Sequence, residues 1–289
     1  MSEAHLFPAM FAVGAAFLFS VSIHIQNLGL GHVDPQSGTI VNIGTTALIY
    51  WALSPFFIEM AFWLTSATAW FAMVGLFRPV LSSNLAIASV KIMGPTLTSG
   101  IAATNPLFAV GFAVLWLGEM PTWTIAIGTL AVVAGVAVTA VRPGGIARGW
   151  PVWALTLPLG AAFFRALGHP LIMTGFKELP SPYFAGLVAY TVSFIVALTA
   201  FRVQGRRFSR FSWGYGWFVL SGMLTGVSVF LLNSALKFGQ LLVVAPVVAC
   251  SPVFTILLSV LIFKRESITL RTVGTIVLVV SGIVLVVLP

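Results

Sequence analysis

Two arginines lie in the middle of apolar segments of the sequence. Arg78 falls within the apolar run 64–90, and Arg165 falls within the run 150–175. An arginine at the centre of a bilayer costs about 2.5–3.5 kcal/mol on insertion scales, so it normally faces a cavity or a partner. We therefore predict a fixed positive charge in a substrate cavity. The structural alternative is an arginine that snorkels, or that binds backbone carbonyl groups freed by Pro79.

The acidic residues bear directly on what these arginines bind. All six carboxylates fall in loops or at the ends of apolar runs: Glu3, Asp34, Glu59, Glu119, Glu178 and Glu266. We therefore expect no carboxylate deep in the membrane to neutralise either arginine. A guanidinium offers paired donors that match a carboxylate or a phosphate, so we infer that the ligand itself is the counter-ion. Amino acids, organic acids and phosphorylated metabolites fit this chemistry, whereas a cation exporter that needs a buried glutamate does not.

Two histidines occupy nearly equivalent positions in the two halves of the chain. His24 and His169 are 145 residues apart, and either could bind a proton at physiological pH. The alternative is that each is a packing residue with a hydrogen-bonded ring. Neither histidine has a second ligand at a metal-binding spacing, so we expect no metal site.

Further polar residues fall within the predicted spans. Thr98 and Ser99 lie on the fourth apolar run, and Asn105 and Ser251 each precede a proline. Proline inside a span frees a carbonyl group and kinks the helix, and such breaks often mark a transporter binding site. The alternative is that the hydroxyl groups bond back to their own helix. Two asparagines, Asn84 and Asn233, are further candidates for substrate binding.

The composition places these residues in a membrane protein. Of 289 residues, 59% are hydrophobic and 7% are charged, against roughly 45–50% and about 25% in soluble domains. The 14 Lys and Arg residues form no stripe, so we predict no nucleic-acid binding. No HExxH, GxSxG or P-loop motif is present, so we expect no enzyme activity and no cofactor. The expected partners are a small molecule and membrane lipids, with the chain a monomer or a homodimer.

Ten apolar runs predict an all-α polytopic membrane protein. Each is long enough to cross a bilayer, which takes about 20 residues. The runs cover residues 7–26, 38–57, 64–90, 95–117, 121–141, 150–175, 182–202, 213–236, 241–263 and 268–288.

The chain contains an internal repeat of five spans. Residues recur at an offset of 146: Gly14 to Phe17 as Gly160 to Phe163, Lys91 as Lys237, Asn105 as Ser251, and Gly128 as Gly274. At an offset of 147, Glu119 pairs with Glu266, Gly75 with Gly222, and Gly135 with Gly282. We place the two repeats at 1–142 and 149–289. An odd number of spans gives the second repeat the opposite orientation, which is the arrangement of many alternating-access transporters.

These motifs resemble the EamA repeat of the drug/metabolite transporter superfamily. They are Ala88 to Lys91, Asn105 to Phe108, Leu117 to Glu119, Gly128 and Gly135, with their counterparts in the second half. The resemblance implies two inverted five-helix repeats around a central cavity lined by helices 1, 3, 4, 6, 8 and 9. It also implies export or exchange of small metabolites, and the YddG-like amino-acid exporters are the nearest analogy.

The loop charges predict an orientation that conflicts with the resemblance. Ten Lys and Arg residues fall in loops 3–4, 5–6, 7–8 and 9–10: Lys91, Arg142, Arg148, Arg202, Arg206, Arg207, Arg210, Lys264, Arg265 and Arg271. Only Lys177 and Lys237 fall on the other face. The positive-inside rule then puts both termini outside, whereas the family resemblance implies cytoplasmic termini.

Together these observations predict a secondary transporter in a bacterial inner membrane. We expect it to export amino acids or related carboxylate-bearing compounds by alternating access. The second hypothesis is an exchanger or importer of organic or phosphorylated anions. A non-transporting membrane subunit is the third.

Overall fold

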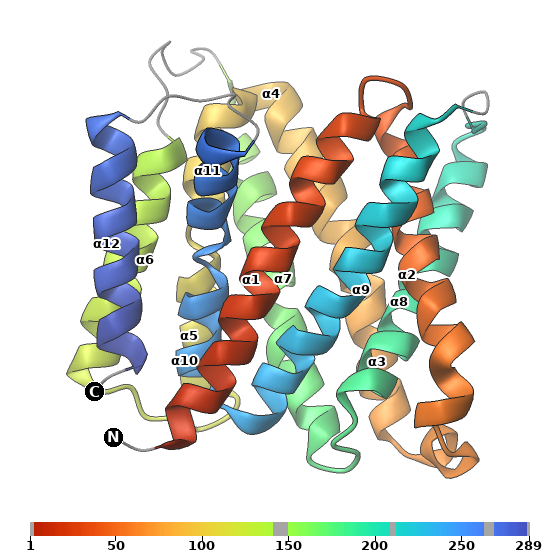
Figure 1. Ribbon diagram of the computed structural model, residues 1–289, viewed down its shortest axis with the longest axis horizontal. Coiled ribbons are helices and arrows are strands. Elements are labelled where there is room, and N and C mark those ends of the chain that lie inside the picture. The colour runs from red at the N-terminus through yellow and green to blue at the C-terminus, as the bar shows by residue number, and fades with distance from the viewer. Residues whose placement is uncertain (1–2, 141–149, 209–211, 263–268, 288–289) are drawn as a thin grey trace.

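Helices account for all regular structure in the part of the chain that the computed structural model describes, residues 3–140, 150–208, 212–262 and 269–287 (Figure 1). Eight helical segments are long and apolar enough to span a membrane, and two shorter apolar helices, at 123–138 and 273–287, bring the number of apolar helical segments to ten. The predicted ten-helix, all-α membrane fold is confirmed. The chain is a multi-pass membrane protein.

The first half contains α1 (Glu3–Gly29), α2 (Pro35–Phe57), the 3-10 helix η1 (Met60–Leu64), α3 (Ala67–Leu76), the π-helical turn η2 (Phe77–Leu81), α4 (Ser82–Ala102), α5 (Asn105–Leu115) and α6 (Trp123–Ala140). The second half contains η3 (Val152–Leu155), α7 (Thr156–Phe176), α8 (Pro182–Val203), α9 (Gly214–Phe238), α10 (Leu241–Val248), α11 (Ser251–Leu261) and α12 (Leu270–Val287).

The boundary between the third and fourth spans lies inside α4. Gly94 has φ +81° and ψ 164°, a backbone conformation that side chains with a Cβ rarely adopt. The third span therefore ends at this glycine, and the rest of α4 continues with α5 as the fourth span. The Thr98 hydroxyl donates to the Gly94 carbonyl at 2.8 Å and lies 2.7 Å from the Ser89 hydroxyl, which ties the two sides of the turn together.

Prolines interrupt the fourth and ninth spans at equivalent places. The helix breaks before Asn105 and again before Ser251, and each following helix has proline in its first turn. Proline has no N–H to bond to the preceding turn, so it can begin a helix but not continue one. The kinks predicted at Pro106 and Pro252 are present as complete breaks in the helix.

Equivalent glycines make equivalent contacts in the two halves. A Cβ on Gly75 would lie 2.4 Å from the carbonyl oxygen of Ala189, and a Cβ on Gly222 would lie 2.7 Å from that of Asn42. Both pairs are related by the same offset of 147 residues. The contact of α3 with α8 therefore repeats the contact of α9 with α2, so the repeat seen in the sequence extends to the packing.

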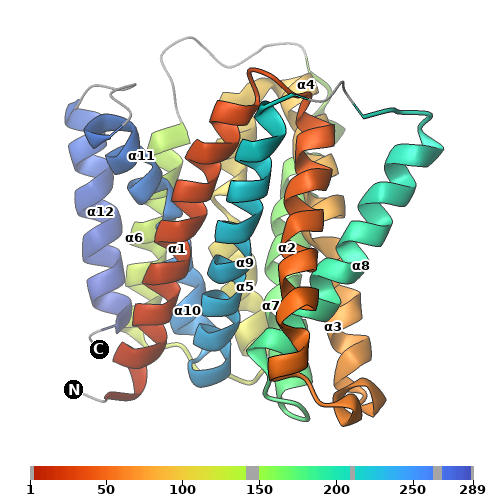
Figure 2. The ribbon, with the colours of Figure 1, turned by 45° about the vertical axis from the view of Figure 1, so that its right-hand side comes forward.

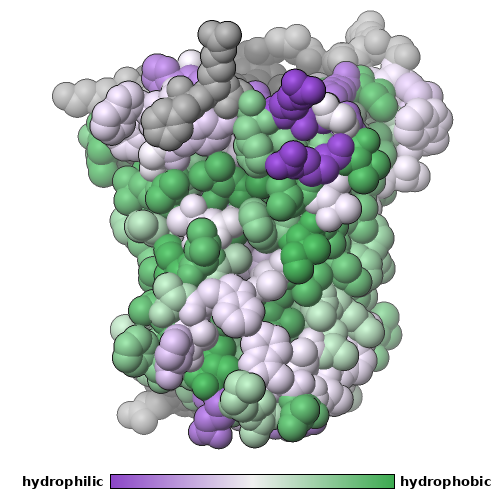
Figure 3. Space-filling view, turned by 90° about the vertical axis from the view of Figure 1, so that its right-hand side faces the viewer, coloured by the Kyte–Doolittle hydropathy of each residue, from purple (hydrophilic) through white to green (hydrophobic). Residues whose placement is uncertain are grey.

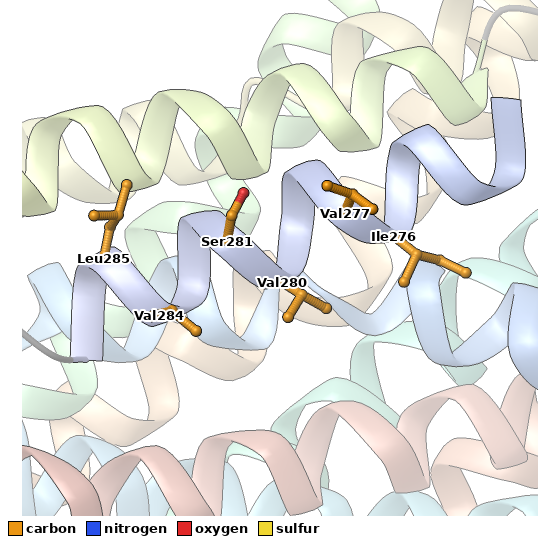
Figure 4. A pocket seen from close by; sticks show the side chains of 6 residues that line it. All are labelled: Ile276, Val277, Val280, Ser281, Val284 and Leu285. Carbon is orange, nitrogen blue, oxygen red and sulfur yellow. The ribbon is translucent and has the colours of Figure 1, made fainter. Parts of the chain in front are cut away.

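At one edge of the molecule, α6 pairs with α12 (Figures 1 and 2). A Cβ on Gly128 would lie 2.6 Å from the Gly282 carbonyl oxygen, and a Cβ on Gly282 would lie 2.6 Å from the Gly128 carbonyl oxygen. Small residues that let two backbones approach this closely are typical of membrane helix pairs. A surface pocket lies along α12, and Figure 4 shows the side chains that line it, almost all of them apolar: Ile276, Val277, Val280, Ser281, Val284 and Leu285. Such a lining suits lipid acyl chains rather than a polar substrate.

Both termini lie at the same end of the molecule (Figure 1). We call this end, with the loops 58–66, 116–122, 177–181 and 239–240, the terminal face. The opposite face carries the connection between α1 and α2, the middle of α4 and the end of α8. In the surface view of Figure 3, strongly hydrophilic residues lie towards these two ends, with hydrophobic residues between them, as expected for a protein embedded in lipid.

The described loop charges divide between the two faces as the sequence predicts. Lys177 and Lys237 lie at the terminal face, and Lys91, Arg202, Arg206 and Arg207 lie at the opposite face. Arg142, Arg148, Arg210, Lys264, Arg265 and Glu266 lie outside the described residues, as do the side chain of Arg271 and the predicted repeat boundaries at 142 and 149. The orientation of the chain across the membrane stays a prediction.

Candidate functional site

The third span is interrupted at Arg78, near its middle. Helix α3 ends at Leu76, and the π-helical turn η2 contains Arg78 with an extended backbone, φ −122° and ψ 135°. The prediction of one continuous helix through this region was wrong. The physical reason is Pro79, which has no N–H for the carbonyl of Gly75 four residues earlier and whose ring disfavours a helical residue before it.

A serine on α8 stabilises this interruption. The buried Ser193 hydroxyl donates to the Gly75 carbonyl at 2.8 Å and also contacts the carbonyl of Arg78. Gly75 O is the acceptor that Pro79 leaves without its helical donor. Ser193 therefore supplies from a neighbouring helix the hydrogen bond that the sequence of the third span removes.

The Arg78 side chain crosses from the turn to α7. A Cβ on Gly168 would lie 2.7 Å from Cδ of Arg78 and 3.4 Å from its Nη1. Only glycine at position 168 leaves room for the arginine stem at this depth. Phe77 immediately precedes Arg78, and Phe164 immediately precedes Arg165. The rings of these two phenylalanines stack, with centroids 5.4 Å apart and planes at 15° to each other.

Arg78 lies against Gly168, three residues from Arg165 on α7, so the structure places both predicted arginines in one region. Arg78 interacts electrostatically with Arg165 and with Tyr190 of α8, and both arginines are only partly exposed. Neither guanidinium has an ion pair or a hydrogen bond to any residue that the structure describes. Two positive charges held near each other without a carboxylate favour an anion between them, because an anion would offset their mutual repulsion.

His169 belongs to the same site. It follows Gly168 on α7, is 5% exposed, and interacts electrostatically with Arg78. Its Nδ1 atom has no hydrogen-bond partner among the described residues. A buried ring nitrogen without a partner is unusual, since most buried polar atoms are hydrogen-bonded. The imidazole can therefore bond to a ligand held by the arginines.

The other candidates are dispersed. His24 Nε2 is 2.8 Å from the carbonyl oxygen of Thr255, and the Ser251 hydroxyl donates to Val248 O at 2.8 Å. With the bond from Thr98 to Gly94, these contacts match the structural alternative of hydroxyl or ring bonds to backbone. Asn84 and Ser99 are exposed.

Two asparagines keep an unpartnered oxygen. Asn233 donates to Pro182 O at 3.1 Å and so joins α9 to the start of α8. Oδ1 of Asn233 and Oδ1 of Asn105 are buried and have no hydrogen-bond partner among the described residues. Asn105 lies at the break in the fourth span, whereas Asn233 has a structural bond.

Three residues of the site could not be identified from the sequence alone. Tyr190 and Ser193 lie on α8, and Gly168 lies beside His169. Tyr190 and Ser193 were visible only as isolated polar residues in an apolar run, and nothing local shows which helix they face. Among the described residues, no group of three or more His, Cys, Asp or Glu side chains is arranged to hold a metal ion.

The comparisons with known proteins agree with this fold. The EamA-like transporter family matches the chain twice, over residues 6–141 and 152–288. A search of curated proteins finds no match. One solved crystal structure superimposes with a TM-score of 0.80 at 17% sequence identity, covering 96% of this chain and 95% of that chain, which shows a shared fold. Because the two family matches cover nearly the whole chain, it belongs to the EamA-like transporter family.

Proposed function

We propose that this EamA-like transporter carries small metabolites that bear a carboxylate, with amino acids or related compounds as the exported class. The proposal rests on one observation, the juxtaposition of Arg78 and Arg165 without a protein counter-ion in the described chain. A planar guanidinium binds a carboxylate through two parallel hydrogen bonds. Its charge does not change with pH in the physiological range, so the site keeps its preference for anions.

The residues around the arginines define the rest of the proposed site. The stacked rings of Phe77 and Phe164 offer an apolar surface next to the charges, which suits a substrate with an apolar or aromatic side chain. The unpartnered Nδ1 of His169 can bond to a second polar group of the substrate. This combination supports the YddG-like amino-acid exporters as the analogy within the superfamily.

The location and the direction of transport are also proposals. We place the protein in a bacterial inner membrane, with export by alternating access between the two halves. A phosphorylated or organic anion exchanged or imported at the same arginines is the second candidate, because a phosphate accepts the same bidentate bonds. Asn105 at the helix break is a further candidate contact.

The test compares a carboxylate with its neutral analogue. Purified protein is reconstituted in liposomes, and uptake of L-phenylalanine is measured in competition with L-phenylalaninamide and with an organic phosphate. The expected result is a preference for the carboxylate. Equal competition by carboxylate and amide would overturn the proposal, and a strong preference for the phosphate would favour the second candidate.

Variants locate the preference at the arginines. Replacing Arg78 or Arg165 by Met should remove charge-assisted bonds worth about 1.5–3 kcal/mol, a loss of affinity of roughly ten- to a hundredfold. Arg78→Lys should restore part of it, since lysine keeps the charge but loses the planar donor pair. Arg202→Met, at the last turn of α8 on the opposite face, is the matched control and should leave uptake unchanged.

A further inference from the structure

Glu119 caps a helix of the other half of the molecule. It lies in the loop between α5 and α6, and its Oε1 and Oε2 accept from the backbone N–H groups of Leu241 and Leu242, both at 2.8 Å. These are the first two residues of α10, and the N-cap residue of that helix, Gln240, makes no side-chain cap bond. Glu119 therefore supplies the cap that the chain does not provide locally. We call this contact the α10 cap.

Glu178 makes the reciprocal contact. It lies in the loop between α7 and α8, and its Oε1 accepts from the backbone N–H of Ser66 at 3.0 Å, while its Oε2 accepts from the Ser66 hydroxyl. Ser66 is the N-cap residue of α3 and makes no cap bond of its own to that helix. We call this contact the α3 cap.

The two caps cross the boundary between the repeats in opposite directions. The α10 cap joins a carboxylate of the first half to a helix of the second, and the α3 cap joins a carboxylate of the second half to a helix of the first. Both lie at the terminal face. We propose that Glu119 and Glu178 are gating residues of the transport cycle, whose helix-capping bonds hold the terminal face closed and must break when this face opens.

Geometry and electrostatics both link the two caps to the closed state of the terminal face. A carboxylate at a helix N-terminus interacts with unpaired N–H groups and with the positive end of the helix dipole. Helix α5, which precedes the Glu119 loop, packs against α10. If the halves separate at this end, α5 and α10 part and Glu119 cannot keep both bonds. The closed state is favoured by these bonds, and a population shift follows when they are removed.

A matched acidic residue provides the control. Glu59 lies on the same face, at the N-cap position of η1, and makes no side-chain cap bond. It has the charge of the two gating residues but no bond across the repeat boundary in the described structure. A change at Glu59 therefore reports the effect of surface charge alone.

The test is a distance measurement and needs no substrate. In a Cys250→Ala background, which removes the only cysteine, spin labels are attached at positions 120 and 238. The native residues, Met120 and Phe238, are 84% and 51% exposed and flank the α10 cap from the two halves. Pulsed electron resonance then gives the distribution of label-to-label distances.

Wild-type protein should show mainly a short distance. In Glu119→Ala, a longer-distance population should grow about tenfold or more relative to the short one, since two charge-assisted bonds are lost. The double variant with Glu178→Ala should show a larger shift, and Glu59→Ala should show none. If Glu119→Ala does not fold, Glu119→Gln, which loses the charge but keeps an acceptor, should give a smaller shift in the same direction.

An unchanged distance distribution in the folded Glu119 and double variants would overturn the proposal, as would an equal shift in Glu59→Ala. The proposal rests on the transporter family and not on the substrate. A loss of carboxylate preference in the transport assay therefore leaves this test unaffected, and the two proposals can fail separately.

Discussion

The third and eighth spans occupy equivalent places in the two repeats, yet only the third is interrupted. From Gly75 to Lys91 the chain advances 16 residues, whereas from Gly222 to Lys237 it advances 15. One additional residue in a helix is accommodated by a π-helical turn, and η2 lies in this interval. The eighth span runs as the single helix α9. Gly75 and Gly222 therefore pack in the same way in the two repeats. The additional residue of the third span accompanies the interruption that creates the arginine site.

The polar groups of the two spans differ in the same way. In the eighth span, Thr225 is 2.8 Å from the Ser22 hydroxyl, and Asn42 donates to the Ser221 hydroxyl. These neutral groups bond to one another and need no ligand. In the third span, Arg78 has a charge and no counter-ion among the described residues. A closed neutral network stabilises helix packing, whereas an open charged site is available for binding.

The largest expected effect tests the shared part of the two spans. Gly75→Val and Gly222→Val should each lower the free energy of unfolding by roughly 3 kcal/mol, because the new side chain would overlap a backbone carbonyl oxygen. Denaturant titration in detergent measures the change. Gly216→Val, also on α9 but with no atom within 4 Å of its Cβ position, is the control. Very different losses at positions 75 and 222 would show that the two contacts are not equivalent.

The second prediction separates the interrupted helix from the regular one. Ser193→Ala should cost about 1–3 kcal/mol, because it leaves the carbonyls of Gly75 and Arg78 without their donor. Thr46→Val should cost only about 0.5–1.5 kcal/mol, because its acceptor, Gly222 O, lies inside a regular helix and keeps its helical bond. The same titrations give both values. A larger loss at Thr46 would contradict the role assigned to Ser193.

The third prediction concerns the position of the arginine. In Gly168→Ala, the new methyl group should displace the Arg78 stem and weaken carboxylate binding about tenfold, equivalent to about 1.4 kcal/mol. Gly160→Ala on the same helix meets only Leu85 at 3.4 Å and should have no such effect. Competition between L-phenylalanine and its amide measures the preference. Unchanged preference in Gly168→Ala would separate Arg78 from the substrate.

The smallest expected effect is the pH dependence of the α3 cap. Hydrogen bonds from Ser66 lower the pKa of the Glu178 carboxyl below its ordinary value of 4.5. A lowered pKa means that the bond stabilises the protein above pH 4.5 and that this contribution is lost as the pH falls through the lowered value. Wild type should therefore melt slightly above Glu178→Gln at pH 7, and the difference should disappear in acid. A difference that does not shrink as the pH is lowered would be incompatible with this link.

Much of the fold could be predicted from residue types alone. The ten spans follow from apolar runs, because each run must bury its backbone polar groups within a helix in lipid. The constant offset between Gly14 and Gly160, and between Lys91 and Lys237, revealed the repeat before any packing was known. The absence of carboxylates from the spans could also be predicted from the sequence. It made Arg78 and Arg165 candidates for ligand binding.

The arrangement around those arginines could not be predicted, because it depends on contacts between distant parts of the chain. The apolar run 64–90 predicted a single uninterrupted third span. The structure decided otherwise, because the carbonyl that Pro79 leaves unpaired is satisfied by Ser193, 118 residues from Gly75. Hydrogen bonds of this kind leave no local periodicity in the sequence.

The sequence by itself determined that the protein is embedded in a membrane, how many spans it has, that it contains an internal repeat and which charges are available for binding. Only the tertiary structure decided that Arg78 lies against Gly168, that His169 has a ring nitrogen without a described partner, and that Glu119 caps α10. The physical reason is that hydrophobicity acts on each segment separately through its transfer into lipid. A hydrogen bond or a steric contact, in contrast, requires two particular groups to meet, and their meeting depends on how all ten spans pack.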